Sequence, residues 1–322
     1  MKKILGIGNA LVDIIIFLNN DDVLHSFALP RGGMQLVDFA VAQKVEEATR
    51  DCKKHMASGG SAANTIHGLA ALGVTTGFFG SVGHDQLGDF FREDMIRAGI
   101  KPFLSKSTSD TGSARALVST DGERTMATFL GAAVELSADK LDPRLFDEYD
   151  HLHLEGYLVL NHSLVEKALE YANRYNMTVS LDLASYNVVE ANLDFLIKVI
   201  RDHVDVVFAN EEEARAFTGH TNPEEALVAI SALCDTAVVK IGEHGSLIHQ
   251  SGKIYKVASD KVNCLDTTGA GDLYAAGFLY GLAASMGPEK CGKIGSLLAG
   301  KVIEEPGAKI SPVSWDFIRK NI

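Results

Sequence analysis

Two carboxylates flank a turn rich in glycine in the segment Asp266-Thr267-Thr268-Gly269-Ala270-Gly271-Asp272. An apolar run of small residues follows at once and predicts a helix. Free N–H groups at a helix N-terminus bind anions, because the amides and the helix dipole both favour negative charge. Asp272 lies inside this predicted anion hole, where its negative charge would compete with a bound anion. Its presence there is explained if the carboxylate has a chemical role. One such role is to take the proton from a hydroxyl that attacks a phosphoryl group.

The plain alternative is a glycine-rich turn whose aspartate stabilises the first turn of the helix. A second glycine segment, Ser58-Gly59-Gly60-Ser61-Ala62-Ala63-Asn64, favours the catalytic interpretation. Its adjacent glycines, Gly59 and Gly60, permit a ligand to approach the backbone closely. Asn64 offers both a donor and an acceptor to a diol. Tight packing of a helix start against a sheet would explain the same small residues.

In this order, the two glycine segments resemble the paired signatures of the PfkB (ribokinase-like) family of sugar and nucleoside kinases. The resemblance covers essentially the whole chain, and the signature Gly269-Ala270-Gly271-Asp272 is specific. It implies a ribokinase-like three-layer αβα fold, with a mostly parallel Rossmann-type sheet and a small β-sheet lid. It also implies an ATP-dependent phosphotransferase with an alcohol acceptor, in which Gly269, Ala270 and Gly271 hold the phosphates and Asp272 is the base.

The composition fits a single α/β enzyme. The chain has 322 residues, of which 46% are hydrophobic, so we expect one large unit with a small accessory unit. No apolar run approaches the roughly 20 residues of a membrane helix. The net charge of −12 argues against a nucleic-acid partner. The four cysteines form no C-x-x-C pair, which argues against zinc and favours reduced thiols in the cytoplasm. The sequence is compatible with either a monomer or a homodimer.

Apolar runs alternate with helical patterns along most of the chain. Helical periodicity covers residues 85–99, 162–175 and 223–233. Alternation of strands and helices predicts a mostly parallel sheet covered on both faces. The predicted buried strands are residues 4–7, 74–79, 179–183, 204–209 and 237–241.

Two regions lack a helix to cover them, residues 12–38 and 105–130. The second contains Asp121-Gly122 between apolar stretches, which is a strong hairpin signal. We therefore predict that 12–38 and 105–130 form a small, discontinuous β lid. Residues 1–11, 39–104 and 131–322 would then form the large α/β nucleotide-binding unit.

Rival phosphate-binding and hydrolytic motifs are absent. The chain has no G-x-x-x-x-G-K-[ST] loop, which argues against a P-loop enzyme. Gly6-Ile7-Gly8 could begin a dinucleotide fingerprint, but Leu11 stands where the third glycine is needed. No G-x-S-x-G nucleophile elbow is present either. A nicotinamide dehydrogenase and a hydrolase of that type are therefore both disfavoured.

Asp13 closes the motif Gly8-Asn9-Ala10-Leu11-Val12-Asp13, which follows the first predicted strand. Open α/β sheets bind ligands at the carboxyl ends of their strands. In the family, an aspartate of this motif accepts hydrogen bonds from sugar hydroxyls. The resemblance therefore implies that Asp13 and Asn9 bind the acceptor, together with Gly59, Gly60 and Asn64. A plain turn carboxylate is the alternative for Asp13.

Asn210-Glu211-Glu212-Glu213 resembles the N-x-x-E motif of the family. This resemblance implies that Asn210 and Glu213 position Mg²⁺ through water, which suits an ion that keeps most of its hydration shell. Stabilisation of the helix dipole would explain the glutamates but not Asn210. The segment 240–245 occupies the place where relatives contact the nucleotide. The cofactor-binding candidates are thus Asn210, Lys240, Gly242, Gly245, Thr267, Gly269 and Gly271.

Two further predictions concern polar side chains near the glycine-rich turn and in the lid. Asp266 and Thr268 resemble the monovalent-cation ligands of some relatives, which implies a site for K⁺, although many relatives lack that cation. Arg124 follows the predicted lid turn, and we expect its guanidinium to point at the transferring phosphate. A solvated arginine in the hairpin is the alternative.

The acceptor is predicted from details within the family. Gly8–Asp13, Gly32-Gly33-Met34 and Leu154-Glu155-Gly156-Tyr157 look most like adenosine kinase and its bacterial relatives, so Glu155 is a substrate-binding candidate. Phe129 could stack on a base, or could belong to the lid core. We therefore expect phosphorylation of the 5′-hydroxyl of a purine nucleoside, with adenosine favoured. A kinase for a free sugar such as ribose or fructose is the alternative, followed by a non-catalytic nucleoside-binding protein.

Overall fold

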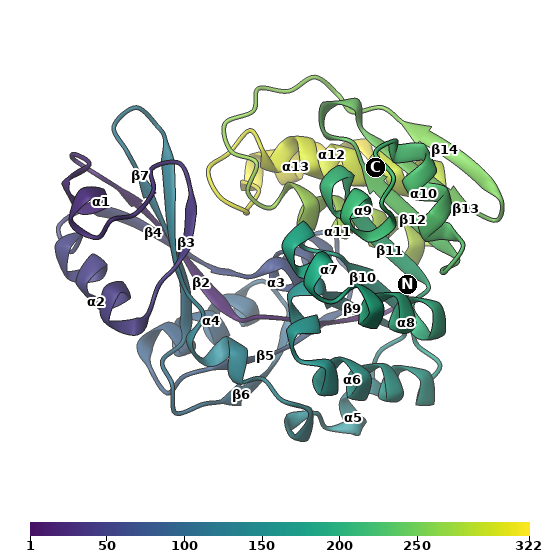
Figure 1. Cartoon of the computed structure of the whole chain (residues 1–322), viewed down its shortest axis with the longest axis horizontal. Coiled ribbons are helices and arrows are strands. Elements are labelled where there is room, and N and C mark those ends of the chain that lie inside the picture. Colours follow the sequence, from purple (N-terminus) through teal and green to yellow (C-terminus); the bar gives the residue numbers. More distant parts are fainter.

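The computed structural model describes residues 1–322, which form two β-sheets. The larger sheet has nine strands in the order β14-β13-β12-β11-β10-β9-β1-β5-β6. Neighbours from β6 to β12 run parallel, whereas β12, β13 and β14 pair antiparallel at one edge. This mostly parallel sheet agrees with the prediction (Figure 1). Its strands are β1 (Ile4–Ile7), β5 (Thr76–Val82), β6 (Lys101–Lys106), β9 (His151–Glu155), β10 (Thr178–Asp182), β11 (Val206–Asn210), β12 (Thr236–Lys240), β13 (Ser246–Gln250) and β14 (Lys253–Val257).

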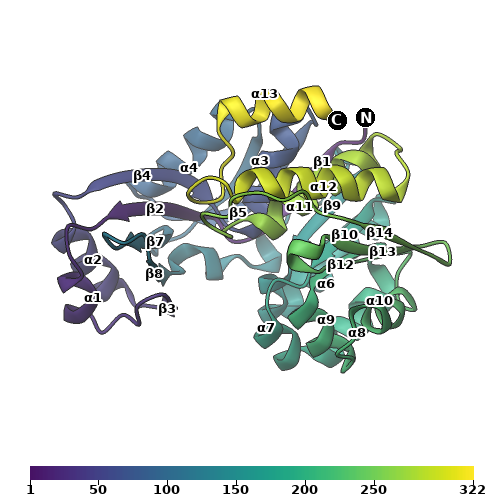
Figure 2. The same ribbon diagram turned by 90° about the horizontal axis from the view of Figure 1, so that it is seen from above.

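Helices pack on both faces of the larger sheet and complete three layers (Figure 2). Successive side chains of a strand point to opposite faces, so Ile4 belongs to one core and Leu5 to the other. No helix is long and apolar enough to cross a membrane. The first core contains α3 (Ser61–Ala71), α4 (Gln86–Arg97), α11 (Ala270–Ala283), α12 (Pro288–Val302) and α13 (Pro312–Asn321). The second contains α5 (Pro143–Phe146), α6 (His162–Arg174), α7 (Tyr186–Ala191), α8 (Leu193–His203), α9 (Glu211–Thr218) and α10 (Pro223–Ser231).

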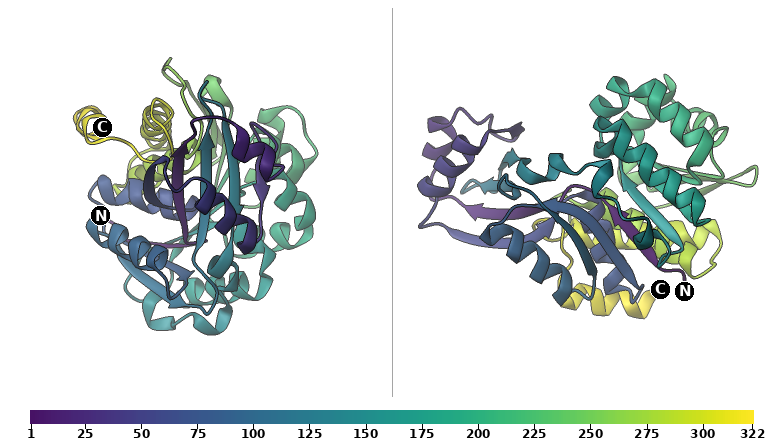
Figure 3. Two further views of the ribbon diagram at one scale, coloured as in Figure 1. Left: turned by 90° about the vertical axis from the view of Figure 1, so that its left-hand side faces the viewer. Right: turned by 90° about the horizontal axis from the view of Figure 1, so that it is seen from below.

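The smaller sheet has five strands in the order β3-β8-β7-β2-β4 and projects from one side of the larger unit (Figures 1 and 3). The turn at Asp121-Gly122 joins β7 to β8 as an antiparallel pair, as predicted. Two helices, α1 (Asp22–Ser26) and α2 (Phe39–Ala48), accompany it. Its strands are β2 (Leu11–Phe17), β3 (Met34–Leu36), β4 (Lys53–Gly59), β7 (Gly112–Val118) and β8 (Arg124–Phe129).

The smaller sheet also includes a segment that the predicted boundaries place in the large unit. Strand β4 lies within residues 39–104 but pairs antiparallel with β2. Its outer residues are polar and largely exposed, because β4 is an edge strand, so no apolar run announces it in the sequence. At the other predicted boundary, residues 105 and 106 end β6 of the larger sheet.

Candidate active site

A cavity of about 2380 Å³ lies between the smaller sheet and the carboxyl ends of the parallel strands. Ligands of open α/β sheets bind at this edge. Typical small-molecule pockets measure roughly 300–1,000 Å³, so this cavity has room for two ligands side by side. The last residues of β9, β10, β11 and β12 all line it: Glu155, Asp182, Asn210 and Lys240.

The predicted anion hole forms at the start of α11. Gly269 precedes the helix with a φ of 77°, a left-handed conformation that glycine adopts without strain. A Cβ atom there would lie 2.6 Å from the Cβ atom of Ala308, so the position also requires a small residue. The N–H groups of Gly271 and Asp272 donate no hydrogen bond to the protein, as expected for the first turn of a helix. They are therefore available to an anion.

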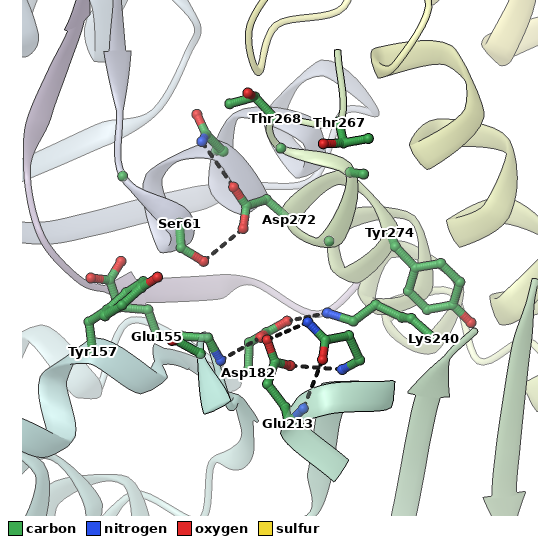
Figure 4. Close-up of a pocket in the computed structure, with 18 of the residues that line it drawn as sticks. Ser61, Glu155, Tyr157, Asp182, Glu213, Lys240, Thr267, Thr268, Asp272 and Tyr274 are labelled. Atoms are coloured by element: carbon green, nitrogen blue, oxygen red, sulfur yellow. Dashed lines mark hydrogen bonds and ion pairs between the residues drawn. The ribbon is translucent and has the colours of Figure 1, made fainter. Parts of the chain in front are cut away.

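The carboxylate of Asp272 is held by side chains from α3. It accepts hydrogen bonds from Ser61 Oγ at 2.7 Å and from Asn64 Nδ2 at 3.0 Å (Figure 4). Thr65 Oγ1 donates to the backbone carbonyl of Asp272 at 3.1 Å. Burial raises the pKa of Asp272 to about 6, and the two side-chain hydrogen bonds oppose that rise. A buried carboxylate with this pKa is well suited to accept a proton near neutral pH.

Asp13 lines the same cavity from β2, and its carboxylate accepts no hydrogen bond from the protein. Gly59 packs against this carboxylate so closely that a Cβ atom at Gly59 would overlap it. Burial raises the pKa of Asp13 to about 6, the nearby Lys309 charge lowers it, and Asp272 raises it. An acceptor with free lone pairs that opens into a cavity is suited to bind ligand hydroxyls.

Glu155 and Asn9 are hydrogen-bonded to each other, a pairing that the sequence did not predict. Glu155 Oε1 accepts from the backbone and side-chain nitrogens of Asn9, and Oε2 accepts from Ala62 N at 2.9 Å. Gly8 leaves space for this carboxylate, and Gly60, with a φ of 101°, lies against the Asn9 carbonyl. Burial raises the pKa of Glu155 to about 7. Although Asn9 and Glu155 both line the cavity, their polar atoms connect the end of β1 to the start of α3.

Phe129 does not line the cavity, contrary to its predicted role as a stacking platform. Its ring packs against Phe39 of α2, with ring centroids 5.6 Å apart. Side chains of a strand alternate between faces, so Met126 and Thr128 line the cavity while Phe129 faces the other side of the sheet. The sequence did not reveal which of the two faces would meet the ligand.

Asn210 and Glu213 form a capping box at the start of α9. Asn210 Nδ2 donates to Glu213 Oε1 and the Asn210 backbone N–H donates to Oε2, both at 2.7 Å. Burial raises the pKa of Glu213 to about 7. Asn210, Glu213 and Asp182 all line the cavity, and their side chains carry oxygen atoms, the donor type that Mg²⁺ prefers. Since each oxygen already has a protein partner or neighbour, this set suits an ion held through its own water shell.

Lys240 reaches beneath the anion hole. Its Nζ atom donates to Asp182 Oδ2 at 2.9 Å and lies 3.1 Å from the place of a Cβ atom at Gly271 (Figure 4). Burial alone would lower the pKa of Lys240, but the carboxylates of Asp182 and Glu213 raise it, so the ammonium group stays charged. Lys240 thus adds a fixed positive charge beside the free N–H groups of α11. The remaining nucleotide candidates, Gly242, Gly245 and Thr267, also line the cavity.

Arg124 lies away from the anion hole and pairs with Asp266. Asp266 also accepts hydrogen bonds from Thr268 N, Thr268 Oγ1 and Gly307 N. Burial alone would raise the pKa of Asp266, but these hydrogen bonds and the Arg124 charge lower it. The guanidinium of Arg124 therefore satisfies the carboxylate that we expected to bind K⁺, and in this arrangement it is not directed at the transferring phosphate.

Three polar residues that contact predicted site residues escaped the sequence prediction: Ser61, Asp182 and Lys309. Ser61 lies inside the second glycine segment, and Asp182 lies near the end of the predicted strand 179–183, so both had a weak signal. Lys309 follows α12 in a loop with no recognisable motif. Its Nζ atom donates to Asn64 Oδ1 at 3.3 Å. Only packing of the C-terminal segment against α3 reveals it.

Comparison with known proteins identifies the family. Residues 34–315 match the model of the pfkB family of carbohydrate kinases. The chain belongs to this family. It is 33% identical to a solved structure of a probable sugar kinase from Rhizobium etli CFN 42, with a TM-score of 0.88 over 99% of this chain and 98% of that chain. It is 32% identical to adenosine kinase from Sinorhizobium meliloti, with a TM-score of 0.87 over 100% and 99% of the two chains.

A curated relative, adenosine kinase 2 from Arabidopsis thaliana, is 25% identical over 94% of each chain. These matches confirm the predicted family, the ribokinase-like fold and the assignment as a phosphotransferase. Kinases of this family use ATP. The names of the relatives include both nucleoside and sugar kinases, so family membership alone leaves the acceptor undecided.

Proposed function

We propose that the protein transfers the γ-phosphoryl group of ATP to the 5′-hydroxyl of a purine nucleoside, with adenosine favoured. The observation behind this choice is an apolar surface on the smaller sheet. Met34 pairs with Met126 across β3 and β8, and Leu36 pairs with Thr128. All four side chains line the cavity, and Met34 and Leu36 are 61% and 58% exposed. Exposed apolar side chains in a binding cavity favour a ligand with an apolar face.

The polar and apolar parts of the cavity match the two parts of a nucleoside. Asp13 and Asp272 supply carboxylates for hydroxyl groups, and Met34, Leu36 and Met126 supply a surface for a flat ring. Methionine is flexible and its sulfur contacts aromatic rings favourably, so it can replace the aromatic platform that we expected at Phe129. The similarity to an adenosine kinase over the whole chain supports the same choice.

The mechanism places the acceptor between Asp13 and Asp272. Asp13 accepts a hydrogen bond from a ribose hydroxyl, and Asp272 takes the proton of the 5′-hydroxyl while that oxygen attacks the γ-phosphorus. The bond from the γ-phosphorus to the bridging oxygen breaks, and ADP leaves. The free N–H groups of Gly271 and Asp272, with the Lys240 ammonium beside them, stabilise negative charge on the phosphoryl oxygens.

Mg²⁺ would neutralise charge on the nucleotide phosphates, held through water by Asn210, Glu213 and Asp182. The cavity is open, so movement of the smaller sheet towards the larger unit would exclude water from the γ-phosphate. Exclusion of water matters because water is a competing acceptor, and its attack would hydrolyse ATP without a product. A K⁺ site at Asp266 and Thr268 would require Arg124 to leave Asp266.

A kinase for a free sugar is the second candidate, favoured by the similarity to a probable sugar kinase. A free hexose or pentose would place hydroxyl groups on both sides of its ring. Met34, Leu36 and Met126 offer those hydroxyls no hydrogen-bond partner, so part of such a ligand would lose hydration without compensation. The nucleoside fits the surface better for this reason.

The decisive experiment measures ADP release from Mg-ATP over a panel of purine nucleosides, pyrimidine nucleosides, ribose and fructose. We expect the highest kcat/KM with a purine nucleoside. The Asp272→Asn variant is the matched control, because its rate should disappear with every acceptor if the ADP comes from this enzyme. A free sugar that exceeds every nucleoside by about tenfold or more would overturn the nucleoside proposal. Nucleoside binding without ADP release would instead indicate the non-catalytic alternative.

A further inference from the structure

Lys309 lies in the loop between α12 and α13, and its ammonium group contacts Asn64, a hydrogen-bond donor to Asp272. Its one side-chain hydrogen bond is to Asn64 Oδ1, and no carboxylate lies within ion-pair distance. Burial lowers the pKa of Lys309 to about 8, while three carboxylates raise it: Asp13, Asp94 and Asp272. They come from β2, α4 and α11, so the ammonium group lies among carboxylates of three different elements.

Asn64 connects Lys309 to Asp272. Its Oδ1 atom accepts from the ammonium, and its Nδ2 atom donates to Asp272 Oδ2. A reversed amide would direct its oxygen at the carboxylate and its nitrogen at the ammonium, and both contacts would be repulsive. Lys309 thereby fixes the orientation in which Asn64 donates to Asp272. Hydrogen bonds in such a chain polarise one another, which strengthens the bond to the carboxylate.

Few other charged groups near Lys309 depend on its positive charge. Asp94 already accepts from Ser58 N at 3.0 Å, from Ser58 Oγ at 2.6 Å and from Arg97 Nη1 at 3.1 Å. His67 of α3 faces Lys309 too, but burial and that charge keep the pKa of His67 well below its usual value, so it is neutral. The unpaired carboxylate of Asp13 is therefore the group that gains most from the ammonium. Asp272 also feels this charge, in addition to that of Lys240.

Both cavity carboxylates must be ionised in the proposed reaction, yet each disfavours ionisation of the other. We propose that Lys309 is a positioning residue that aims Asn64 at Asp272 and supplies the positive charge that lets Asp13 and Asp272 be ionised together. It acts through Asn64 and through its field, without touching either ligand, since it does not line the cavity. The inference depends on the proposed function for its activity measurement only.

Three substitutions of Lys309 distinguish the effect of its charge from the effect of its shape. Lys309→Met keeps the length of the side chain and removes the charge, Lys309→Gln also keeps an N–H donor, and Lys309→Arg keeps the charge. Lys293→Met is the matched control, because Lys293 is 64% exposed on α12 and pairs only with Glu289. The quantity to measure is kcat/KM as a function of pH, with whichever acceptor reacts fastest.

In Lys309→Met and Lys309→Gln, we expect the acid limb of the kcat/KM profile to shift to higher pH by about one pH unit or more, because loss of the positive charge raises the pKa of the carboxylates. Lys309→Arg and Lys293→Met should keep the limb of the unmodified enzyme, and KM for ATP should change little in all four. In an Asp13→Asn background, Lys309→Met should shift the limb by much less, because one of the two carboxylates is gone. A folded Lys309→Met or Lys309→Gln variant with an unchanged profile would overturn the proposal. So would an Arg variant as impaired as Met, because that result would indicate a role of shape.

A second measurement needs no acceptor and so separates this inference from the proposed function. The pKa of Asp13 rises from 3.8 to about 6 on folding, so its contribution to stability is present below pH 3.8 and is lost as pH rises through 6. Without the ammonium, the folded pKa rises further and the loss above pH 6 grows. Lys309→Met should therefore lose more stability, relative to the unmodified chain, at pH 7.5 than at pH 5. An equal loss at both pH values would contradict the proposal even if no kinase activity were found.

Discussion

The side-chain amide of Asn64 donates to the carboxylate of Asp272 across 3.0 Å, although 208 residues separate them in the chain. The contact exists because α3 and α11 pack side by side, with Gly68 facing Ala276 so closely that a Cβ atom at Gly68 would lie 2.6 Å from the Ala276 methyl. Asp272 is thereby oriented by a helix other than its own. Burial raises its pKa to about 6, and the hydrogen bonds from α3 favour the ionised form. The residue is thus a base that is ionised, but only weakly solvated, at neutral pH.

Asp272→Asn should lower turnover by about 10²–10⁴-fold, because asparagine has nearly the same shape but cannot accept the hydroxyl proton. ATP affinity should survive or increase, since a negative charge leaves the anion hole. Steady-state kinetics and ATP titration of the same preparation would measure both effects. A folded variant that retains more than about a tenth of normal turnover would show that Asp272 is a structural residue of the first helical turn.

Asp13→Ala should raise KM for the acceptor and leave KM for ATP almost unchanged. The substitution removes a charge-assisted hydrogen bond of about 1.5–3 kcal/mol, which corresponds to a roughly tenfold to hundredfold effect. Initial rates with each substrate varied in turn would separate the two constants. If only KM for ATP changed, Asp13 would belong to the nucleotide side of the cavity.

Glu155→Gln tests whether this carboxylate is a brace or a ligand. An amide cannot accept from both Asn9 and Ala62 without opposing one N–H donor to another, so unfolding should become easier by about 1–3 kcal/mol. Because folding raises the Glu155 pKa from 4.5 to about 7, its contribution to stability declines as pH rises through 7. The deficit of the variant should accordingly be smaller at pH 8 than at pH 5 in denaturant titrations. A large change in acceptor KM with unchanged stability would restore the predicted ligand role.

Met126→Ala and Phe129→Leu form a matched pair on opposite faces of β8. The first removes apolar contact area from the cavity and should raise KM for the nucleoside about three- to tenfold. The second loosens the packing against Phe39 and should reduce stability while KM stays the same. Kinetics and thermal unfolding of both variants would compare the faces. The reverse pattern would place the base against Phe129 after all.

Local features of the sequence determined much of this architecture. The glycine-rich start of α11, the apolar strands and the Asp121-Gly122 hairpin are backbone properties of short segments, and each of these predictions agrees with the structure. The order of the motifs along the chain is also a property of the sequence alone, and it indicated the family that the comparisons confirm. Strand β4 escaped because an edge strand with polar residues has no local apolar pattern.

Packing decided which side chains meet. The orientation of β8 directs Met126, and not Phe129, into the cavity. The lid hairpin lies close to the 266–268 turn, so Arg124 pairs with the carboxylate of Asp266 and not with a phosphate. Lys309 reached Asn64 only because the C-terminal loop lies against α3. Such contacts join residues that are far apart in the chain, and their energies depend on burial, distance and shared charge. None of these quantities has a signature in local residue types, so only the folded arrangement defines them.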